Sequence, residues 1–211
     1  MSEAVKEIFN EISPTYDRLN HLLSLNMDKS WRKKAVSMIQ APKMPFQILD
    51  LCAGTYDLSL ECFRQHAQCK VTAADFSQNM LDAGIPKIQA FLEAGKIRPV
   101  CCDALQMPFE DNSFETVICG YGVRNFDDTA KGMKEIFRVL KPGGQAVVLE
   151  FFRPDSASAR FFHKTYANII IPSIGKLVSG NGDAYQYLKE SIQGFLSLKE
   201  YNELLKKVGF K

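Results

Sequence analysis

The fold of this chain is decided by residues 48–57, which read ILDLCAGTYD. The apolar half predicts a buried strand, and the small residues after it predict a tight turn that leads into a helix over 57–65. Such a turn brings the backbone close to a ligand and points a helix N-terminus at it. Cys52, Gly54 and Tyr56 occupy alternate positions that are usually all glycine in a nucleotide-binding loop. The loop therefore predicts a nucleotide-like cofactor, and the Tyr56 side chain must either point away from it or fill part of its space.

Apolar strands alternate with helices along the rest of the chain. This alternation predicts an α/β fold with a doubly wound, mostly parallel sheet, whose ligands bind at the carboxyl ends of the strands. The strands are expected at 48–51, 70–74, 97–101, 114–119 and 145–151. The helices are expected at 57–65, 78–83, 86–94, 128–140 and 198–208. The segments expected at the binding edge are 52–57, 75–80, 103–108, 120–126 and 150–154.

The sequence predicts a single domain over residues 1–211. Apolar residues at helical spacing predict an N-terminal helical cap over about 3–40, with breaks near 13–14 and 25–26. The aromatic and aliphatic segment of about 151–190 interrupts the alternation and predicts an inserted helical lid over the binding edge, with an extra packing helix as the alternative. Sheets of this class usually continue with one or two more strands, so we expect the C-terminal strands to be absent.

The composition is that of an ordinary globular domain. The chain of 211 residues is 46% hydrophobic and 24% charged, and its net charge of +2 gives no reason to expect a nucleic-acid partner. Its six cysteines form no CxxC pair and have no nearby histidine at metal-ligand spacing, which favours free thiols in a reducing compartment and no metal site. No apolar run approaches the roughly 18 residues of a membrane-spanning helix. We therefore expect a cytoplasmic protein, which can still lie on a membrane surface.

Two acidic residues follow predicted strands at the binding edge. Asp75 comes about 20 residues after the loop, where a carboxylate can accept both hydroxyls of a ribose; capping the helix that begins near Ser77 is the alternative. Asp103, followed by Ala104, can accept from an adenine amino group or close a turn. A nicotinamide cofactor is disfavoured because the loop lacks two glycines of its fingerprint and carries Asp57, which would repel a diphosphate. The residues favour S-adenosylmethionine, which carries an ammonium and a sulfonium.

Two longer motifs are distinctive: GVRN at residues 122–125 and DAYQYLKESI at 183–192. Over essentially all of residues 5–210 the chain resembles the UbiE/COQ5/MenG family of quinone-biosynthesis C-methyltransferases. The other stretches that carry the resemblance are 9–20, 25–32, 105–114 and 139–144. The resemblance implies a Rossmann-like methyltransferase fold and S-adenosylmethionine as the cofactor. The cofactor-binding positions that it implies are Cys52, Gly54, Thr55, Asp75, Asp103, Ala104 and the backbone at Gly120.

The resemblance also implies a substrate. It points to methylation of the ring of a polyprenylated quinol, either demethylmenaquinol or a polyprenyl benzoquinol, in menaquinone or ubiquinone biosynthesis. Such a substrate resides in a membrane, so we expect peripheral membrane contact, and a homodimer is compatible with the sequence. The alternatives are a non-catalytic S-adenosylmethionine-binding or scaffold protein of the same fold, and a methyltransferase that acts on another small molecule.

Arg124 is the first catalytic candidate. A ring carbon becomes nucleophilic when the adjacent phenol is deprotonated, and a cation can stabilise the phenolate. Arginine, with a pKa above about 12, is a poor base, so we expect electrostatic stabilisation from it. The alternative for Arg124 is a structural ion pair with Asp127 or Glu150. The further candidates are Asn125 and Tyr185, with Tyr187 and His163 as secondary ones.

Overall fold

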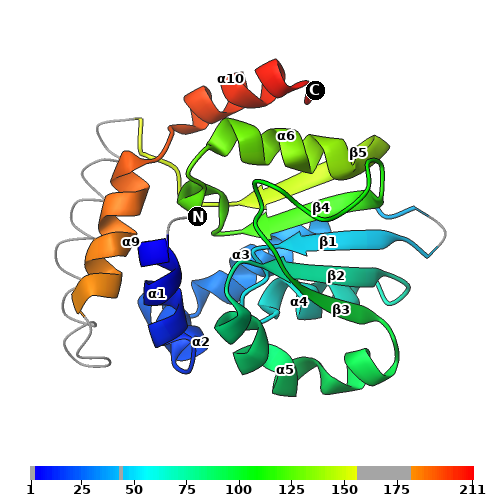
Figure 1. The fold of residues 1–211 in the computed structure, drawn as a ribbon, viewed down its shortest axis with the longest axis horizontal. Coiled ribbons are helices and arrows are strands. Elements are labelled where there is room, and N and C mark those ends of the chain that lie inside the picture. The colour runs from blue at the N-terminus through cyan, green and yellow to red at the C-terminus, as the bar shows by residue number, and fades with distance from the viewer. Residues whose placement is uncertain (1–2, 43–44, 156–181) are drawn as a thin grey trace.

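The computed structural model describes residues 3–42, 45–155 and 182–211, which build a five-stranded sheet with helices on both faces (Figure 1). All neighbouring strands pair in parallel, in the order β3-β2-β1-β4-β5. The predicted doubly wound α/β fold is thereby confirmed. The strands are β1 (Gln47–Leu51), β2 (Lys70–Asp75), β3 (Ile97–Cys101), β4 (Phe114–Gly120) and β5 (Leu140–Leu149).

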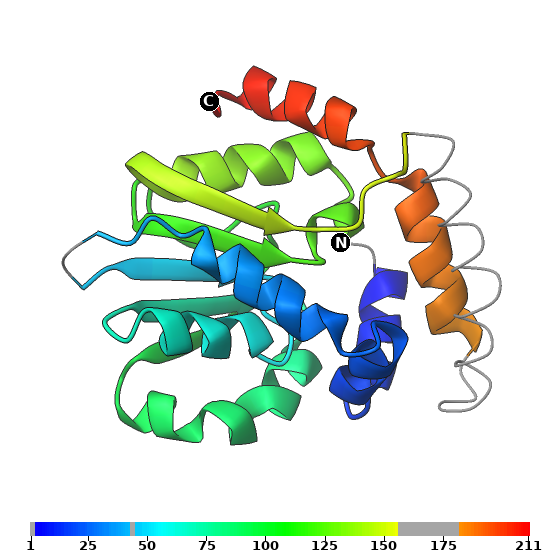
Figure 2. The ribbon, with the colours of Figure 1, turned by 180° about the vertical axis from the view of Figure 1, so that it is seen from behind.

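The helices that cover the sheet are α3 (Met27–Ser37), α4 (Asp57–Gln65), α5 (Gln78–Glu93), α6 (Thr129–Val139) and α10 (Leu198–Val208). These helices lie on both faces of the sheet (Figures 1 and 2). An apolar core lies on each face. Successive side chains of a strand point to opposite faces, so Ile48 joins the core under α3, α4 and α5. Leu49 and Leu51 join the core under α6 and α10.

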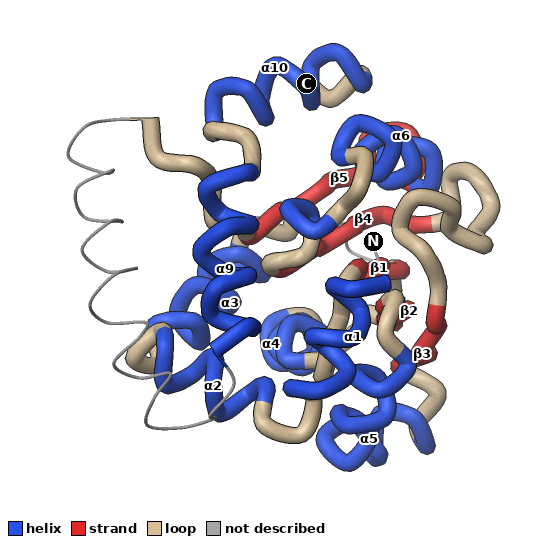
Figure 3. The backbone as a smooth tube through the Cα atoms, turned by 60° about the vertical axis from the view of Figure 1, so that its left-hand side comes forward, coloured by secondary structure: helices blue, strands red, loops and turns tan. Residues whose placement is uncertain are grey.

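The N-terminal helices form the predicted cap. Helices α1 (Glu3–Ile12) and α2 (Tyr16–Leu23) lie with α9 (Gly182–Gly194) at the carboxyl ends of the strands (Figures 1 and 3). The ring of Phe9 in α1 meets the ring of Tyr187 in α9 edge-on, with 6.4 Å between their centroids. The breaks between the cap helices fall where the sequence predicts them. Of the lid predicted over about 151–190, residues 156–181 lie outside the described residues, and α9 begins within its last part.

The two helices predicted at 78–83 and 86–94 are one helix, α5, and this prediction was wrong. Pro86 lies inside it, although a proline normally breaks a helix because it lacks an N–H donor. Leu81 and Ile88 lie on either side of the proline and are almost fully buried. Their packing against the core holds both halves of α5 in line.

The last strand begins earlier than the sequence predicts. Leu140 already pairs with Phe114, and pairing then resumes between Gln145 and Thr116. Residues 141–144, which lie between the helix predicted at 128–140 and the strand predicted at 145–151, therefore leave the ladder as a bulge within β5. Strand β5 therefore includes residues 141–144, although they make no pairs with β4.

Tyr56 points away from the binding edge. Its side chain is fully buried in the core beside α5, where its ring lies so close to Gly84 that an added Cβ there would come within 2.5 Å of it. The backbone keeps a glycine-like shape, since φ is 59° at Cys52, 54° at Gly54 and 70° at Tyr56. A non-glycine residue in this left-handed region costs about 1–2 kcal/mol. The Tyr56 side chain therefore does not block the cofactor loop, and it gives no argument for a non-catalytic protein.

The contact between Tyr56 and Gly84 can be tested by a double-mutant cycle. Tyr56→Gly is expected to lower the free energy of unfolding by about 2–4 kcal/mol, because the loss of a buried aromatic ring exceeds the relief of backbone strain. Gly84→Ala should cost about 1–3 kcal/mol through overpacking. Because the two residues touch, the double variant should lose less free energy of unfolding than the two single variants lose together, as measured by urea denaturation. Strict additivity would contradict the contact.

Candidate active site

The loop after β1 packs tightly against the end of β4. The Cβ and Sγ atoms of Cys52 lie 2.5 Å from the position that a Cβ at Gly122 would take, so only glycine fits there. A contact with the Cys119 thiol and burial raise the pKa of Cys52, which makes it a neutral packing group and not a nucleophile. At Gly120 an added Cβ would come within 2.5 Å of the Leu58 side chain. Since Leu51 pairs with Cys119, Cys52 and Gly120 are the residues that directly follow this pair at the binding edge.

The carboxylate of Asp75, at the end of β2, organises the same loop. Its Oδ2 accepts a hydrogen bond of 2.8 Å from the Gly54 N–H, and its Oδ1 accepts one of 2.9 Å from the Ser77 N–H. Burial raises the pKa of Asp75, although these N–H donors act in the opposite direction. The side-chain cap of α5 is the Ser77 hydroxyl, which accepts from Met80 N–H at 3.1 Å. Each oxygen of Asp75 keeps a second lone pair, so the carboxylate can still accept from a diol.

Asp103 and Ala104 lie beside Asp75 at the ends of neighbouring strands. Cys101, the last residue of β3, is in register with Asp75, and Asp103 follows two residues later. The Oδ1 atom of Asp103 accepts a hydrogen bond of 3.0 Å from the Leu105 N–H, as a turn-closing acid does. Ala104 is almost fully buried beneath the turn. One carboxylate oxygen therefore shapes the turn, and adenine recognition by Asp103 stays a prediction.

The Thr55 side chain connects the cofactor loop to the N-terminal cap by a hydrogen bond. Its hydroxyl donates to Asp17 Oδ1 at 2.5 Å and accepts from Lys87 Nζ at 3.2 Å. Lys87 also pairs with Asp17 at 2.8 Å and with Asp57 at 2.6 Å. Arg32 lies 3.1 Å from the other oxygen of Asp57. Asp57 thus contacts two cations, each of which is shared with another carboxylate, and it belongs to an ion-pair network that connects the loop to the cap.

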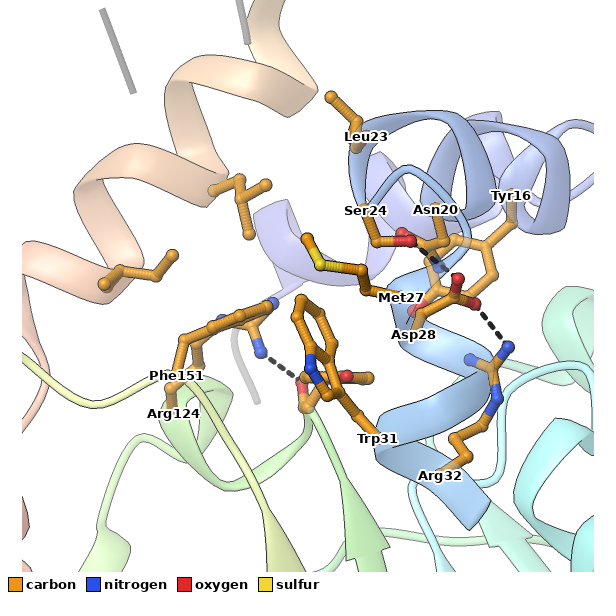
Figure 4. Close-up of a pocket in the computed structure, with 13 residues that line it drawn as sticks. Tyr16, Asn20, Leu23, Ser24, Met27, Asp28, Trp31, Arg32, Arg124 and Phe151 are labelled. Atoms are coloured by element: carbon orange, nitrogen blue, oxygen red, sulfur yellow. Dashed lines mark hydrogen bonds and ion pairs between the residues drawn. The ribbon is translucent and has the colours of Figure 1, made fainter. Parts of the chain in front are cut away.

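A cavity of about 340 Å³ opens between the cap and α9, over the ends of β4 and β5 (Figure 4). Its walls are mainly apolar and aromatic. Phe151 meets Trp31 edge-on at 5.7 Å between centroids and stacks on Tyr121 at 5.1 Å and 22°. The residues that line it are Tyr16, Asn20, Leu23, Ser24, Met27, Asp28, Trp31, Arg32, Tyr121, Arg124, Phe151, Leu188 and Ile192.

The carboxylate of Asp28 lies on the cap side of the cavity and is paired with neighbouring side chains. Its side chain is buried and bonded to Arg32, to the Ser24 hydroxyl at 2.6 Å and to His21 Nδ1 at 2.7 Å. Burial would raise the pKa of Asp28, but the Ser24 hydroxyl and the Arg32 charge together lower it. Asp28 therefore stays ionised and paired, and it serves to hold the cap helices together.

Arg124, from the short 3₁₀ helix Val123–Asn125 after β4, faces the cavity from the other side. Its Nη1 lies 2.7 Å from Glu150 Oε1 and donates to the Tyr121 carbonyl at 2.6 Å, while its Nε donates to Ser191 at 3.3 Å. The Arg124 side chain is 7% exposed and that of Glu150 is 0% exposed, so this is a buried ion pair. Burial acts to lower the pKa of Arg124, but the Glu150 carboxylate raises it by more, so the pKa of Arg124 is raised overall. The Glu150 partner that the sequence left as an alternative is therefore present.

The other predicted catalytic residues differ in how the structure places them. Asn125 is buried, and its Oδ1 accepts a hydrogen bond of 2.7 Å from Tyr187 in α9. Its Nδ2 donates to the Tyr121 carbonyl at 3.4 Å, so the Asn125 side chain links α9 to the binding edge. Tyr185 lies within α9, but its side chain is outside what the structure describes, and His163 falls in the undescribed segment.

A model of the ubiE/COQ5 methyltransferase family matches residues 1–211. The chain belongs to this family. The demethylmenaquinone methyltransferase of Bacteroides fragilis is 36% identical over 209 residues, which cover 99% of this chain and 85% of the relative. The ubiquinone/menaquinone biosynthesis C-methyltransferase UbiE of Geobacter sulfurreducens is 38% identical over 210 residues, which cover 99% of this chain and 81% of the relative.

The fold agrees with that of solved methyltransferases. Phosphoethanolamine N-methyltransferase 2 of Haemonchus contortus, solved in complex with S-adenosyl-L-methionine, superposes with a TM-score of 0.62 at 20% identity, over 85% of this chain and 36% of the other. As a member of the ubiE/COQ5 family, the chain is an S-adenosylmethionine-dependent methyltransferase. Its own residues fit that cofactor, because the left-handed loop, the carboxylate of Asp75 and the turn at Asp103 meet at one edge.

The sequence found the cofactor edge but missed most of the cavity. Trp31, Tyr121 and Phe151 come from three separate segments, and no local pattern marks them as neighbours. Tyr121 had a detectable signal, since it directly precedes the GVRN motif. Within the described part of the chain, no group of three or more His, Cys, Asp or Glu could hold a metal ion. Likewise, no described helix has the length and hydropathy needed to cross a bilayer.

Proposed function

We propose that this methyltransferase methylates a ring carbon of a polyprenylated quinol. The observation that carries the proposal is the cavity over the ends of β4 and β5, with aromatic walls and a single arginine on its strand side. Planar rings stack on such walls, and an apolar pocket with few convergent polar groups is typical of a small-molecule site. The names of the relatives from B. fragilis and G. sulfurreducens support a quinol ring as the occupant.

Arg124 is proposed to stabilise the negative charge that the quinol oxygen gains as its carbon attacks. Nη1 of Arg124 donates hydrogen bonds to Glu150 and to the Tyr121 carbonyl, and its Nε donates to Ser191. Among the described residues, Nη2 has no bonded partner and can face an oxygen in the cavity. When bound, S-adenosylmethionine supplies an electrophilic methyl group on a sulfonium. The protein residues then orient the ring and exclude water.

The prenyl tail is proposed to leave the cavity at the turn between α2 and α3. Met27 lines the cavity and is 44% exposed, and Leu25 beside it is 62% exposed. Leu22, at 39% exposure, extends the same apolar corner. An apolar corner next to a substrate opening suits a reversible contact with a membrane surface, where the tail resides.

Transfer of label from methyl-labelled S-adenosylmethionine tests the proposed function. The purified chain should methylate a reduced short-tail demethylmenaquinol or a polyprenyl benzoquinol analogue, and comparing the two gives the ring preference. A heat-inactivated sample and the oxidised quinones, which lack a nucleophilic ring, are the controls. Failure to label either quinol, in a protein that binds the cofactor by calorimetry, would overturn the quinol assignment.

A further inference from the structure

Tyr121 is held rigidly at the floor of the cavity. Its backbone is left-handed, with φ of 58°, and its N–H donates to the Leu149 carbonyl at 2.7 Å. Its carbonyl accepts from Arg124 and Asn125, and its ring is stacked on Phe151. A non-glycine residue is kept in this conformation only where the surroundings over-determine it. The position of the phenol ring is therefore fixed by contacts that do not involve its hydroxyl.

Among the side chains that the structure describes, the hydroxyl of Tyr121 has no hydrogen-bond partner. Within the described residues, the buried side-chain oxygens and nitrogens that lack a hydrogen bond are Asp50 Oδ1, Tyr56 Oη and Tyr121 Oη. Only Tyr121 of these three residues lines the cavity. A buried hydroxyl without a partner costs about 1–3 kcal/mol, so this one is a destabilising feature of the free protein.

The surroundings of this hydroxyl suit a ring oxygen that becomes negative. Burial is the largest influence on Tyr121 and raises its pKa, so the hydroxyl keeps its proton at neutral pH and acts as a donor. The charges that act on it are those of Arg32, Asp28 and Glu150, together with the Tyr16 phenol. Arg32, Asp28 and Tyr16 line the cavity, as Tyr121 itself does, and Glu150 belongs to the ion pair behind it, so the hydroxyl lies close to the cavity wall.

We propose that Tyr121 is a substrate-recognition residue whose hydroxyl donates a hydrogen bond to a ring oxygen of the acceptor. This inference rests on the proposed function, because it takes the occupant of the cavity to be a quinol ring. Tyr121 and Arg124 lie on the same side of the cavity, one as a neutral donor and one as a cation. Together they select a ring that carries an oxygen beside the carbon to be methylated, and they fix the register of that ring.

Tyr121→Phe is the test, since it removes one oxygen and leaves the ring stack in place. We expect kcat/KM for the quinol to fall about 10- to 100-fold, the effect of losing one hydrogen bond to a developing charge. The affinity for S-adenosylmethionine should not change, and the melting temperature should stay the same or rise. A hydroxyl with a structural role would instead lower the melting temperature. Unchanged kcat/KM in the variant would overturn the inference.

A matched control is Tyr201→Phe. Tyr201 is buried in the core under α10, and its hydroxyl is already bonded to Met133 Sδ at 3.1 Å. This variant should keep full activity and should not gain stability. A fall in activity equal to that of Tyr121→Phe would show a general effect of losing a buried hydroxyl and would overturn the inference.

Binding of truncated rings separates this inference from the proposed function. Trp31, the single tryptophan of the chain, lines the cavity and reports its occupation by fluorescence quenching. The wild type should bind the quinol more tightly than at least one analogue in which a ring hydroxyl is replaced by hydrogen, and Tyr121→Phe should lose that preference. If the wild type methylates no quinol, the proposed function fails. If it methylates the quinol and both proteins show the same preference, only the Tyr121 inference fails.

Discussion

Replacement of Asp75 by alanine is expected to weaken the binding of S-adenosylmethionine by more than about 100-fold, to below detection by calorimetry. Two charge-assisted hydrogen bonds to a ribose, each worth about 1.5–3 kcal/mol, would be lost. The Gly54 N–H would also lose its acceptor, so the loop that cradles the cofactor would loosen. Undiminished affinity in this variant would refute the ribose assignment.

Two controls isolate the contribution of the diol. Asp111→Ala removes a carboxylate that is 67% exposed and paired with Arg138, far from the binding edge, and it should bind the cofactor normally. An S-adenosylmethionine analogue without the two ribose hydroxyls should bind the wild type and Asp75→Ala with similar weakness. A large difference between the two proteins for this analogue would assign the loss to the loop and not to the diol.

Arg124→Met is expected to lower both stability and turnover, for separable reasons. The substitution leaves Glu150 buried without its partner, which should cost about 3–5 kcal/mol of unfolding free energy. Pairing it with Glu150→Gln removes the uncompensated charge and keeps an acceptor for the Phe151 N–H, so the double variant should recover most of the stability. Its turnover should remain about 100- to 1000-fold below wild type, because the stabilising cation is still absent. Denaturation and single-turnover methyl transfer measure the two quantities.

Arg138→Met provides the comparison for Arg124. Arg138 is 29% exposed, and its partners Glu135 and Asp111 lie at the surface away from the cavity. Its loss should cost about 1 kcal/mol or less and leave turnover unchanged. A stable Arg124 and Glu150 double variant with wild-type turnover would show that the pair is only structural.

The helix α10 illustrates what short-range sequence signals can predict. Ser197 caps it by accepting from the Glu200 N–H, and the Glu200 side chain accepts from the Ser197 N–H in return. These signals lie within four residues of one another, so the predicted span, 198–208, matches the structure. The opposite case is α5, where Pro86 is a local break signal that buried contacts from distant segments override.

Some features of the candidate site could likewise be predicted from the sequence, and others depend on the tertiary structure. The order of the loop, Asp75, Asp103 and the GVRN motif follows from the alternation of strands and helices, because parallel strands bring their carboxyl ends to one edge. The pairing of Arg124 with Glu150 spans 26 residues and depends on β4 and β5 being neighbours in the sheet. The sequence could name Glu150 as a partner but could not choose it over Asp127.

The loop at residues 48–57 shows where the sequence stops being sufficient. The sequence by itself determined the strand and the tight turn of this loop, because these depend on local backbone preference. It also determined the family, through motifs elsewhere in the chain such as GVRN at residues 122–125. Only the tertiary structure decided the direction of Tyr56, because the space that receives its ring is made by Gly84 on another helix. The cavity was decided in the same way, by α2, α3 and α9 meeting over the sheet. Side-chain packing depends on contacts between segments far apart in the chain, and a local pattern does not encode them.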